Sequence, residues 1–76
     1  MENLFSTNIT INDQKVLYKV VFDQEQYVFV SEAGNRELPR FSFKRLHDEW
    51  VDQDTVPAEI KDQAIDALEK YLLKQL

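Results

Sequence analysis

The chain has 76 residues, which is enough for one domain and too few for two. It contains no cysteine and one histidine, a composition that excludes disulfides and the common zinc-ligand sets. Hydrophobic residues make up 43% of the chain, which indicates a folded protein, and a formal net charge of −5 disfavours binding to nucleic-acid phosphates.

The N-terminal half predicts three strands joined by short turns. Residues 5–11 alternate between apolar and polar side chains, the period of a half-buried strand. Asn12 and Asp13 predict a turn, because both side chains tolerate the left-handed backbone region. Residues 15–22 and 27–32 are rich in β-branched and aromatic residues, and residues 23–26 form a short hairpin connection between them.

A fourth strand is predicted over residues 40–45. Gly34 marks the turn before it, because glycine adopts positive φ without a steric cost. Pro39 precedes the strand, a place that suits a strand start or an edge. Short loops between consecutive strands indicate an antiparallel meander. Asp48, Glu49, Asp52 and Asp54 are predicted to belong to a solvated acidic connector, and Trp50 is predicted to close the end of the core where the chain crosses from the sheet to a helix.

The C-terminal third has a helical period over about residues 57–75. Its apolar stripe consists of Ile60, Ala64, Ala67, Leu68, Tyr71, Leu72 and Leu76. Pro57 suits the first helical turn, and Asp66 precedes Lys70 by four positions, a favourable order for an ion pair. We therefore predict one α+β domain over residues 1–76, with a four-stranded antiparallel meander sheet and a C-terminal helix on one face, in the order β-β-β-β-α.

Hairpin parity predicts which residues share each face of the sheet. A loop of two or four residues after Phe22 sets Phe22 opposite Tyr27 on the helix side. The helix-facing core is then Ile9, Ile11, Val16, Tyr18, Val20, Phe22, Tyr27, Phe29, Phe41 and Phe43. Val21 stands opposite Val28 on the other side, where no second helix is predicted to cover them.

The outer side of the sheet is therefore a candidate interaction face, formed by Leu17, Val21, Val28 and Val30. The alternative is ordinary apolar surface, because over half of any folded surface is apolar and lysine stems lie across it. Self-association through this face would also offset the small core of a domain of this size.

The only net-basic segment of the chain is a candidate basic edge, formed by Arg36, Arg40, Lys44 and Arg45. Alternation directs Phe41 and Phe43 to the core and the neighbouring bases to solvent, as in an edge strand guarded by charge. A nucleic-acid-binding sheet instead needs its aromatic and basic side chains on one exposed face. An acidic protein or peptide is the functional alternative for this segment.

No residue set points to catalysis, a metal or a cofactor. His47 stands beside Asp48 and Glu49, but a solvated histidine is the simpler interpretation than a general-base pair. The carboxylates of residues 48–54 lack the central glycine of a calcium-binding loop, so they are predicted to be solvated.

The sequence therefore predicts a cytoplasmic, non-enzymatic protein-interaction or self-associating module. Its expected partner is a protein or a second copy, with no nucleic acid and no membrane involved, since no signal-peptide pattern or long apolar run is visible. Two alternatives remain open. One is an acidic regulator or inhibitor of a nucleic-acid-binding protein, acting through Glu59, Asp62, Asp66 and Glu69. The other is a small-ligand-binding domain with a pocket near Trp50 and His47.

Overall fold

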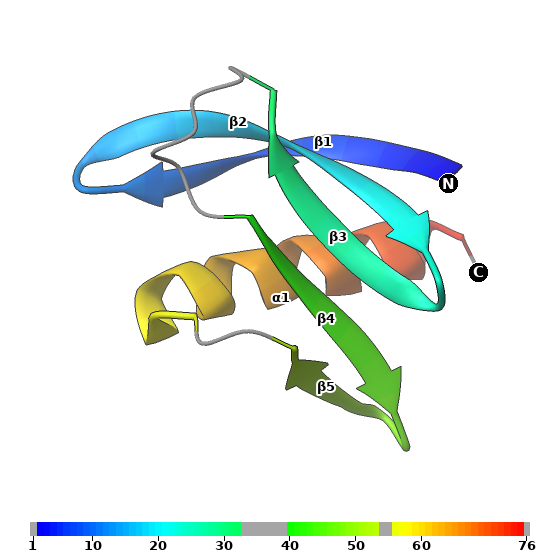
Figure 1. Ribbon diagram of the computed structural model, residues 1–76. Helices are drawn as coiled ribbons and strands as arrows, with labels where there is room; N and C mark the ends of the chain where they lie inside the picture. Colours follow the sequence, from blue (N-terminus) through cyan, green and yellow to red (C-terminus); the bar gives the residue numbers. More distant parts are fainter. Residues whose placement is uncertain (1, 33–39, 54–55, 76) are drawn as a thin grey trace.

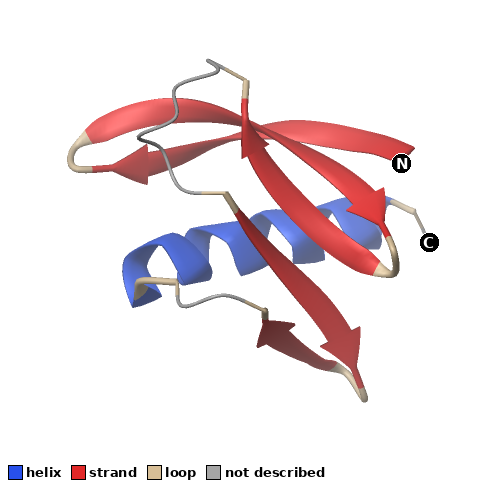
Figure 2. Cartoon of the chain, in the orientation of Figure 1, coloured by secondary structure: helices blue, strands red, loops and turns tan. Residues whose placement is uncertain are grey.

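A computed structural model describes residues 2–32, 40–53 and 56–75, which form an antiparallel sheet and one helix (Figure 1). The strands, in sheet order, are β1 (Glu2–Ile11), β2 (Gln14–Asp23), β3 (Gln26–Ser31), β4 (Phe41–Leu46) and β5 (Glu49–Asp52), followed by helix α1 (Ala58–Lys74). The sheet curves over the helix, which lies against one of its faces (Figure 2). The predicted α+β class is confirmed, with five strands in the described ranges where four were expected.

Three hairpins of the described sheet close through two-residue turns without glycine. Their central residues are Asn12–Asp13, Gln24–Glu25 and His47–Asp48, and each has a φ between +50° and +67°. Positive φ at both central residues is the requirement of a type I′ turn, whose twist matches that of the flanking strands. The predicted turn at Asn12–Asp13 is confirmed.

The two-residue turn between β2 and β3 produces the predicted register. Phe22 pairs with Tyr27, and Val21 pairs with Val28 on the opposite face. The buried core consists of Ile9, Tyr18, Val20, Phe29, Phe41 and Phe43 from the sheet and Ile60, Ala64 and Leu68 from α1. The ring of Phe29 lies at the centre, stacked 5.0 Å from Phe41 and edge-on to Phe43 at 5.9 Å between centroids.

The prediction of a connector between the sheet and the helix was wrong for residues 49–52, which form β5. Its Trp50 pairs with Arg45 of β4 and packs at the margin of the core. The turn before it, His47–Asp48, has neither glycine nor asparagine, and the strand is short and acidic, so the usual hairpin signals are missing. The predicted turn at Gly34 and the acidic Asp54 lie outside the described residues.

Helix α1 agrees with the predicted range. It begins after Pro57, whose carbonyl accepts a hydrogen bond from the Lys61 N–H at 2.9 Å, and no side chain caps it. The predicted ion pair is present, with 2.9 Å between Lys70 Nζ and Asp66 Oδ2.

The helix lies antiparallel along β1, one edge of the sheet. Near its start, the side chain of Gln63 binds the backbone of Thr10 twice. The Thr10 N–H donates to Oε1 at 2.8 Å, and Nε2 donates to the Thr10 carbonyl at 2.9 Å. Near its end, the rings of Tyr71 and Phe5 stack with centroids 4.7 Å apart. The first and last elements of the described fold therefore hold each other in place.

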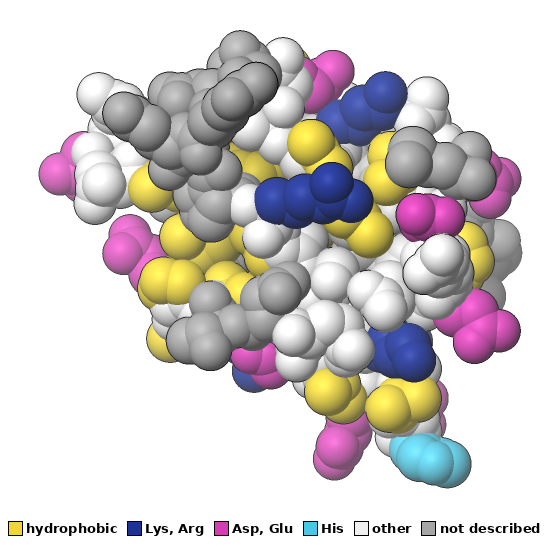
Figure 3. All heavy atoms as spheres, in the orientation of Figure 1, with side chains coloured by type: hydrophobic (Ala, Val, Ile, Leu, Met, Phe, Trp, Pro, Cys, Tyr) yellow, Lys and Arg dark blue, Asp and Glu magenta, His cyan; other side chains and the backbone are white. Residues whose placement is uncertain are grey.

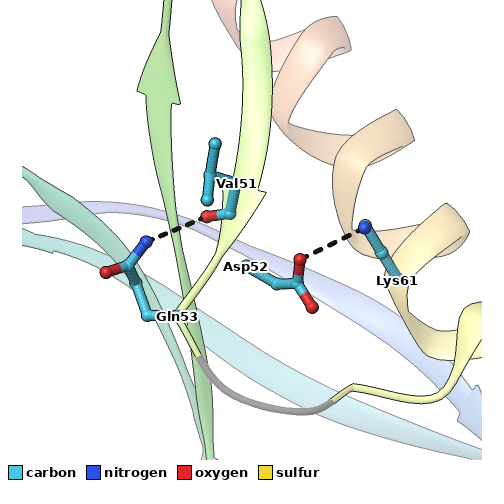
Figure 4. A network of polar contacts seen from close by, with 4 residues as sticks. All are labelled: Val51, Asp52, Gln53 and Lys61. Atoms are coloured by element: carbon cyan, nitrogen blue, oxygen red, sulfur yellow. Dashed lines mark hydrogen bonds and ion pairs between the residues drawn. The ribbon is translucent and has the colours of Figure 1, made fainter.

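The opposite edge, β5, is tied to the helix by an ion pair (Figure 4). Lys61 Nζ donates to Asp52 Oδ1 at 3.2 Å, and the two side chains are 35% and 31% exposed. Next to it, Gln53 Nε2 donates to the Val51 carbonyl at 3.2 Å. The hydrogen bond from Lys61 lowers the pKa of the Asp52 carboxyl below its ordinary value.

Replacing Asp52 with Asn is expected to lower the free energy of unfolding at neutral pH. Because the folded-state pKa of Asp52 is lowered, its charge stabilises the fold above the unfolded-state pKa, and this contribution is lost as the pH falls through the folded-state pKa. Urea titrations followed by circular dichroism should therefore show midpoints that differ at pH 7 and converge in acid. Asp66→Asn is the control. The Asp66–Lys70 pair is far more exposed, so breaking it should change the midpoint less than Asp52→Asn does. Equal midpoints for Asp52→Asn and the parent chain at pH 7 would contradict the prediction.

Candidate functional site

The candidate face on the outer side of the sheet is only partly open. Leu17 is 46% exposed and Val30 is half-buried, but Val21 and Val28 are only 4% and 7% exposed. The expectation of an uncovered face was therefore wrong for the two valines. They stand opposite each other in the middle of the sheet and are flanked by the neighbouring strands, in a row that runs from Asn3 to Ser42.

The candidate basic edge is not an edge. Arg36 lies outside the described residues, and Arg40 is exposed just before β4. Lys44 and Arg45 belong to β4, which lies between β3 and β5. Alternation along β4 places Lys44 on the outer face and Arg45 on the helix side, where its Cζ lies 4.8 Å from the centre of the Trp50 ring. The structure therefore separates these bases instead of gathering them.

The structure does not bring the candidate catalytic or ligand-binding residues together. His47 is exposed in the β4–β5 turn, and neither it nor Trp50 lines any of the hollows described below. Within the described ranges, no group of three or more acidic or histidine side chains is placed to hold a metal ion. No helix in those ranges combines the length and the hydropathy of a membrane span. The acidic side chains of α1 face solvent, as expected.

Three adjoining hollows lie where the β2–β3 turn, the β4–β5 hairpin and the last turns of α1 meet. Their volumes are about 560, 330 and 240 Å³. Arg45 lines the first two, Phe22 and Tyr27 line the last two, and Leu72 lines the first and third. We call this surface the end groove, and define it by Phe22, Tyr27, Arg45, Leu46, Leu72 and Leu73.

The end groove has an aromatic base and a charged rim. The Tyr27 ring lies 5.1 Å from the ring of Phe22 and 5.4 Å from that of Trp50. The rim carries Arg45 and Lys44 as cations and Glu2, Glu25 and Glu69 as anions. An apolar centre with a polar rim is the usual composition of a protein–protein interface.

Exposed apolar residues gather at this end of the molecule. Two of the large hydrophobic residues that are exposed in the described ranges line its hollows, Leu46 at 49% and Leu73 at 68%. Figure 3 shows hydrophobic side chains over the tip of the β4–β5 hairpin, set between basic and acidic ones. Clustered exposed apolar side chains of this kind mark interaction sites.

The indole of Trp50 is a further unusual feature beneath the end groove. Its Nε1–H is buried and has no hydrogen-bond partner within the described residues. A buried donor without a partner costs free energy, and locally unfavourable groups concentrate at functional sites. The ring is held between the Tyr27 ring and the Arg45 guanidinium, two residues that line the end groove.

Sequence reasoning missed the end groove because its walls come from three distant segments. One signal was present in the helix, where Leu73 stands outside the apolar stripe that faces the sheet. Leu46 gave a second, weaker signal, as a leucine in a segment otherwise rich in charge.

In comparisons with family models, with curated proteins and with solved structures, nothing matches this chain, so the case for a function rests on the geometry of the chain itself.

Proposed function

We propose that this domain is a non-catalytic protein-interaction module whose binding surface is the end groove. The observation that supports the proposal is the apolar cluster of exposed Leu46 and Leu73, which line the hollows of a groove with an aromatic base. Removing apolar surface from water contributes about 25 cal/mol per Å², so a partner that covers this cluster gains affinity from each side chain.

The groove suits a segment of a protein better than a small molecule. A small-molecule site encloses most of its ligand, whereas Leu73 keeps two-thirds of its side chain in solvent and projects from the surface. A protein segment covers such a projection with side chains on several sides. A protein segment with an apolar centre and polar flanks therefore fits the end groove.

Arg45 determines which charge the partner should carry where it meets the end groove. Its guanidinium lies over the Trp50 ring and lines two of the three hollows. Its only ion pair in the described ranges is a long one, 3.9 Å to the fully exposed Asp48. A carboxylate on the partner can replace this weak contact with a bidentate one, which is stronger and directional.

Site-directed photo-cross-linking in the cells that naturally produce the protein tests the proposal. A photoreactive phenylalanine analogue is placed at Leu73 in one variant and at Leu17, an exposed leucine on the outer sheet face, in the matched control. We expect a discrete protein adduct from position 73 and none from position 17. The Arg45→Ala change should reduce the yield of the adduct from position 73.

Other outcomes of this experiment point elsewhere. Equal adducts from both positions, or none from position 73, would contradict the end groove as the binding surface. A third probe at Asp62, on the exposed acidic face of α1, tests the alternative of an acidic regulator. An adduct with a basic nucleic-acid-binding protein from that position alone would favour the alternative.

A further inference from the structure

The edge strand β1 has a long stretch of backbone in which no charged residue or proline hinders pairing with another strand. Residues 4–12 carry no charge and no proline, and the strand is ten residues long. Proteins usually blunt such an edge with short strands, lysines or prolines. The other edge, β5, follows this rule, because it has only four residues and its Asp52 is tied to Lys61.

The hairpin turn fixes which backbone groups of β1 point away from the sheet. A two-residue turn makes Ile11 and Gln14 a hydrogen-bonded pair, so alternate residues from there point toward β2. The N–H and C=O groups of Ser6, Asn8 and Thr10 therefore point outward. Those of Thr10 are bound by Gln63, whereas those of Ser6 and Asn8 have no partner within the described residues.

Gln63 shows what this edge binds. A side-chain carboxamide presents one C=O and one N–H, the same groups as a peptide bond. Bound at 2.8 and 2.9 Å to both groups of Thr10, it occupies the place of a peptide unit in a neighbouring strand. The chain thus closes one position of the edge with an amide and leaves the next two positions open.

We infer that the open edge of β1 accepts an extended segment of a partner protein, which pairs with Ser6 and Asn8 as an additional strand. A hollow of about 270 Å³ lies beside this edge, between β1 and α1, and is lined in part by Thr7, Ala67 and Lys74. Side chains of the added strand that point toward the helix enter this hollow. Lys74 has no ion pair in the described ranges, so an acidic side chain fits there.

A second copy of the chain fits this edge poorly. Paired strands lie about 4.8 Å apart, whereas packed helices need about 8–10 Å between their axes. Because α1 lies along β1 in each copy, pairing two β1 strands would bring two helices into the same space. An isolated extended segment brings no helix with it, so it is the occupant that the geometry favours.

This edge is a different surface from the end groove, and the inference does not depend on the proposed function. The two surfaces adjoin at Tyr71, which lines a hollow of each. Variants at positions that line no hollow of the other surface therefore separate them. Leu73→Asp disables the end groove, and Asn8→Pro disables the edge by removing an outward N–H that takes no part in the β1–β2 ladder.

A displayed library of random short peptides tests the inference. Peptides that bind the Asn8→Pro variant are removed first, and the remainder are selected on the parent chain. We expect enrichment of extended, β-branched sequences that carry an acidic residue. Their affinity should fall at least about tenfold on Asn8→Pro, the effect of losing roughly one good hydrogen bond, and stay unchanged on Leu73→Asp.

A second measurement uses the parent chain alone, so it does not depend on the folding of any variant. Enriched peptides are resynthesised with alternate backbone amides methylated, which keeps every side chain and removes the strand-pairing N–H groups. We expect binding to disappear, and the amide resonances of Ser6 and Asn8 to shift only with the unmodified peptide. No enrichment, equal binding of methylated peptides, or a dimer of the parent chain that Asn8→Pro dissociates would each overturn the inference.

Discussion

Replacing Phe29 with Ala is expected to unfold the domain at room temperature. Phe29 is fully buried, and its ring contacts those of Phe41 and Phe43 at the centre of the core. Truncating a buried phenylalanine to alanine costs about 3–5 kcal/mol. A single core in a chain of this length supplies only about 3–5 kcal/mol of net stability, so little or none would remain. Near-ultraviolet circular dichroism and the dispersion of amide resonances measure the loss directly.

Phe22→Ala is the matched control for this prediction. Phe22 points to the same side of the sheet on the neighbouring strand, but it is half-buried at the margin. Its truncation should lower the urea midpoint and leave a cooperative transition. A Phe29→Ala variant that unfolds cooperatively at the midpoint of the parent chain would contradict the central role assigned to this ring.

Replacing Gln24–Glu25 with Asn-Gly is expected to stabilise the domain by about 1–2 kcal/mol. Both residues have positive φ, at 51° and 63°, where an ordinary side chain crowds its own backbone. Asparagine tolerates this region and glycine has no side chain to crowd, which is why this pair is favoured in type I′ turns. The melting temperature should rise by at least roughly 4 °C, as expected for a domain of this size.

The turn between β1 and β2 provides the control for this substitution. Asn12–Asp13 has the same backbone conformation, but its side chains already tolerate positive φ. Changing Asp13 to Gly should therefore raise the melting temperature by less than the Gln24–Glu25 exchange does. The strain assigned to Gln24–Glu25 would be disproved by an unchanged melting temperature in the Asn-Gly variant.

Local patterns predicted most of the fold. The alternation in β1 to β4, together with an even loop length, gave the pairing of Phe22 with Tyr27 and the composition of the core. The helix followed from its apolar stripe. β5 could not be predicted in the same way, because its two apolar residues, Trp50 and Val51, are adjacent and its turn lacks the residues that usually adopt positive φ.

The candidate functional surfaces were much less predictable from the sequence. The burial of Val21 and Val28 depends on flanking strands that the pattern of β2 and β3 does not describe. The end groove joins Phe22, Arg45 and Leu72, which are far apart in the chain. The uncharged stretch of β1 is visible in the sequence, but the contact from Gln63 to Thr10, which indicates what this edge binds, is long-range and no local pattern predicts it.

The contact between the first strand and the only described helix has a consequence for synthesis on the ribosome. Thr10 and Gln63 are 53 positions apart, so nearly the whole described chain must leave the exit tunnel before β1 meets α1. Until then the meander can form from local hairpins, but one face, with Phe29 and Phe43, stays in water. The nascent chain therefore exposes this apolar face from the time the meander forms until the helix reaches it, and the arrival of the helix covers the face in one step.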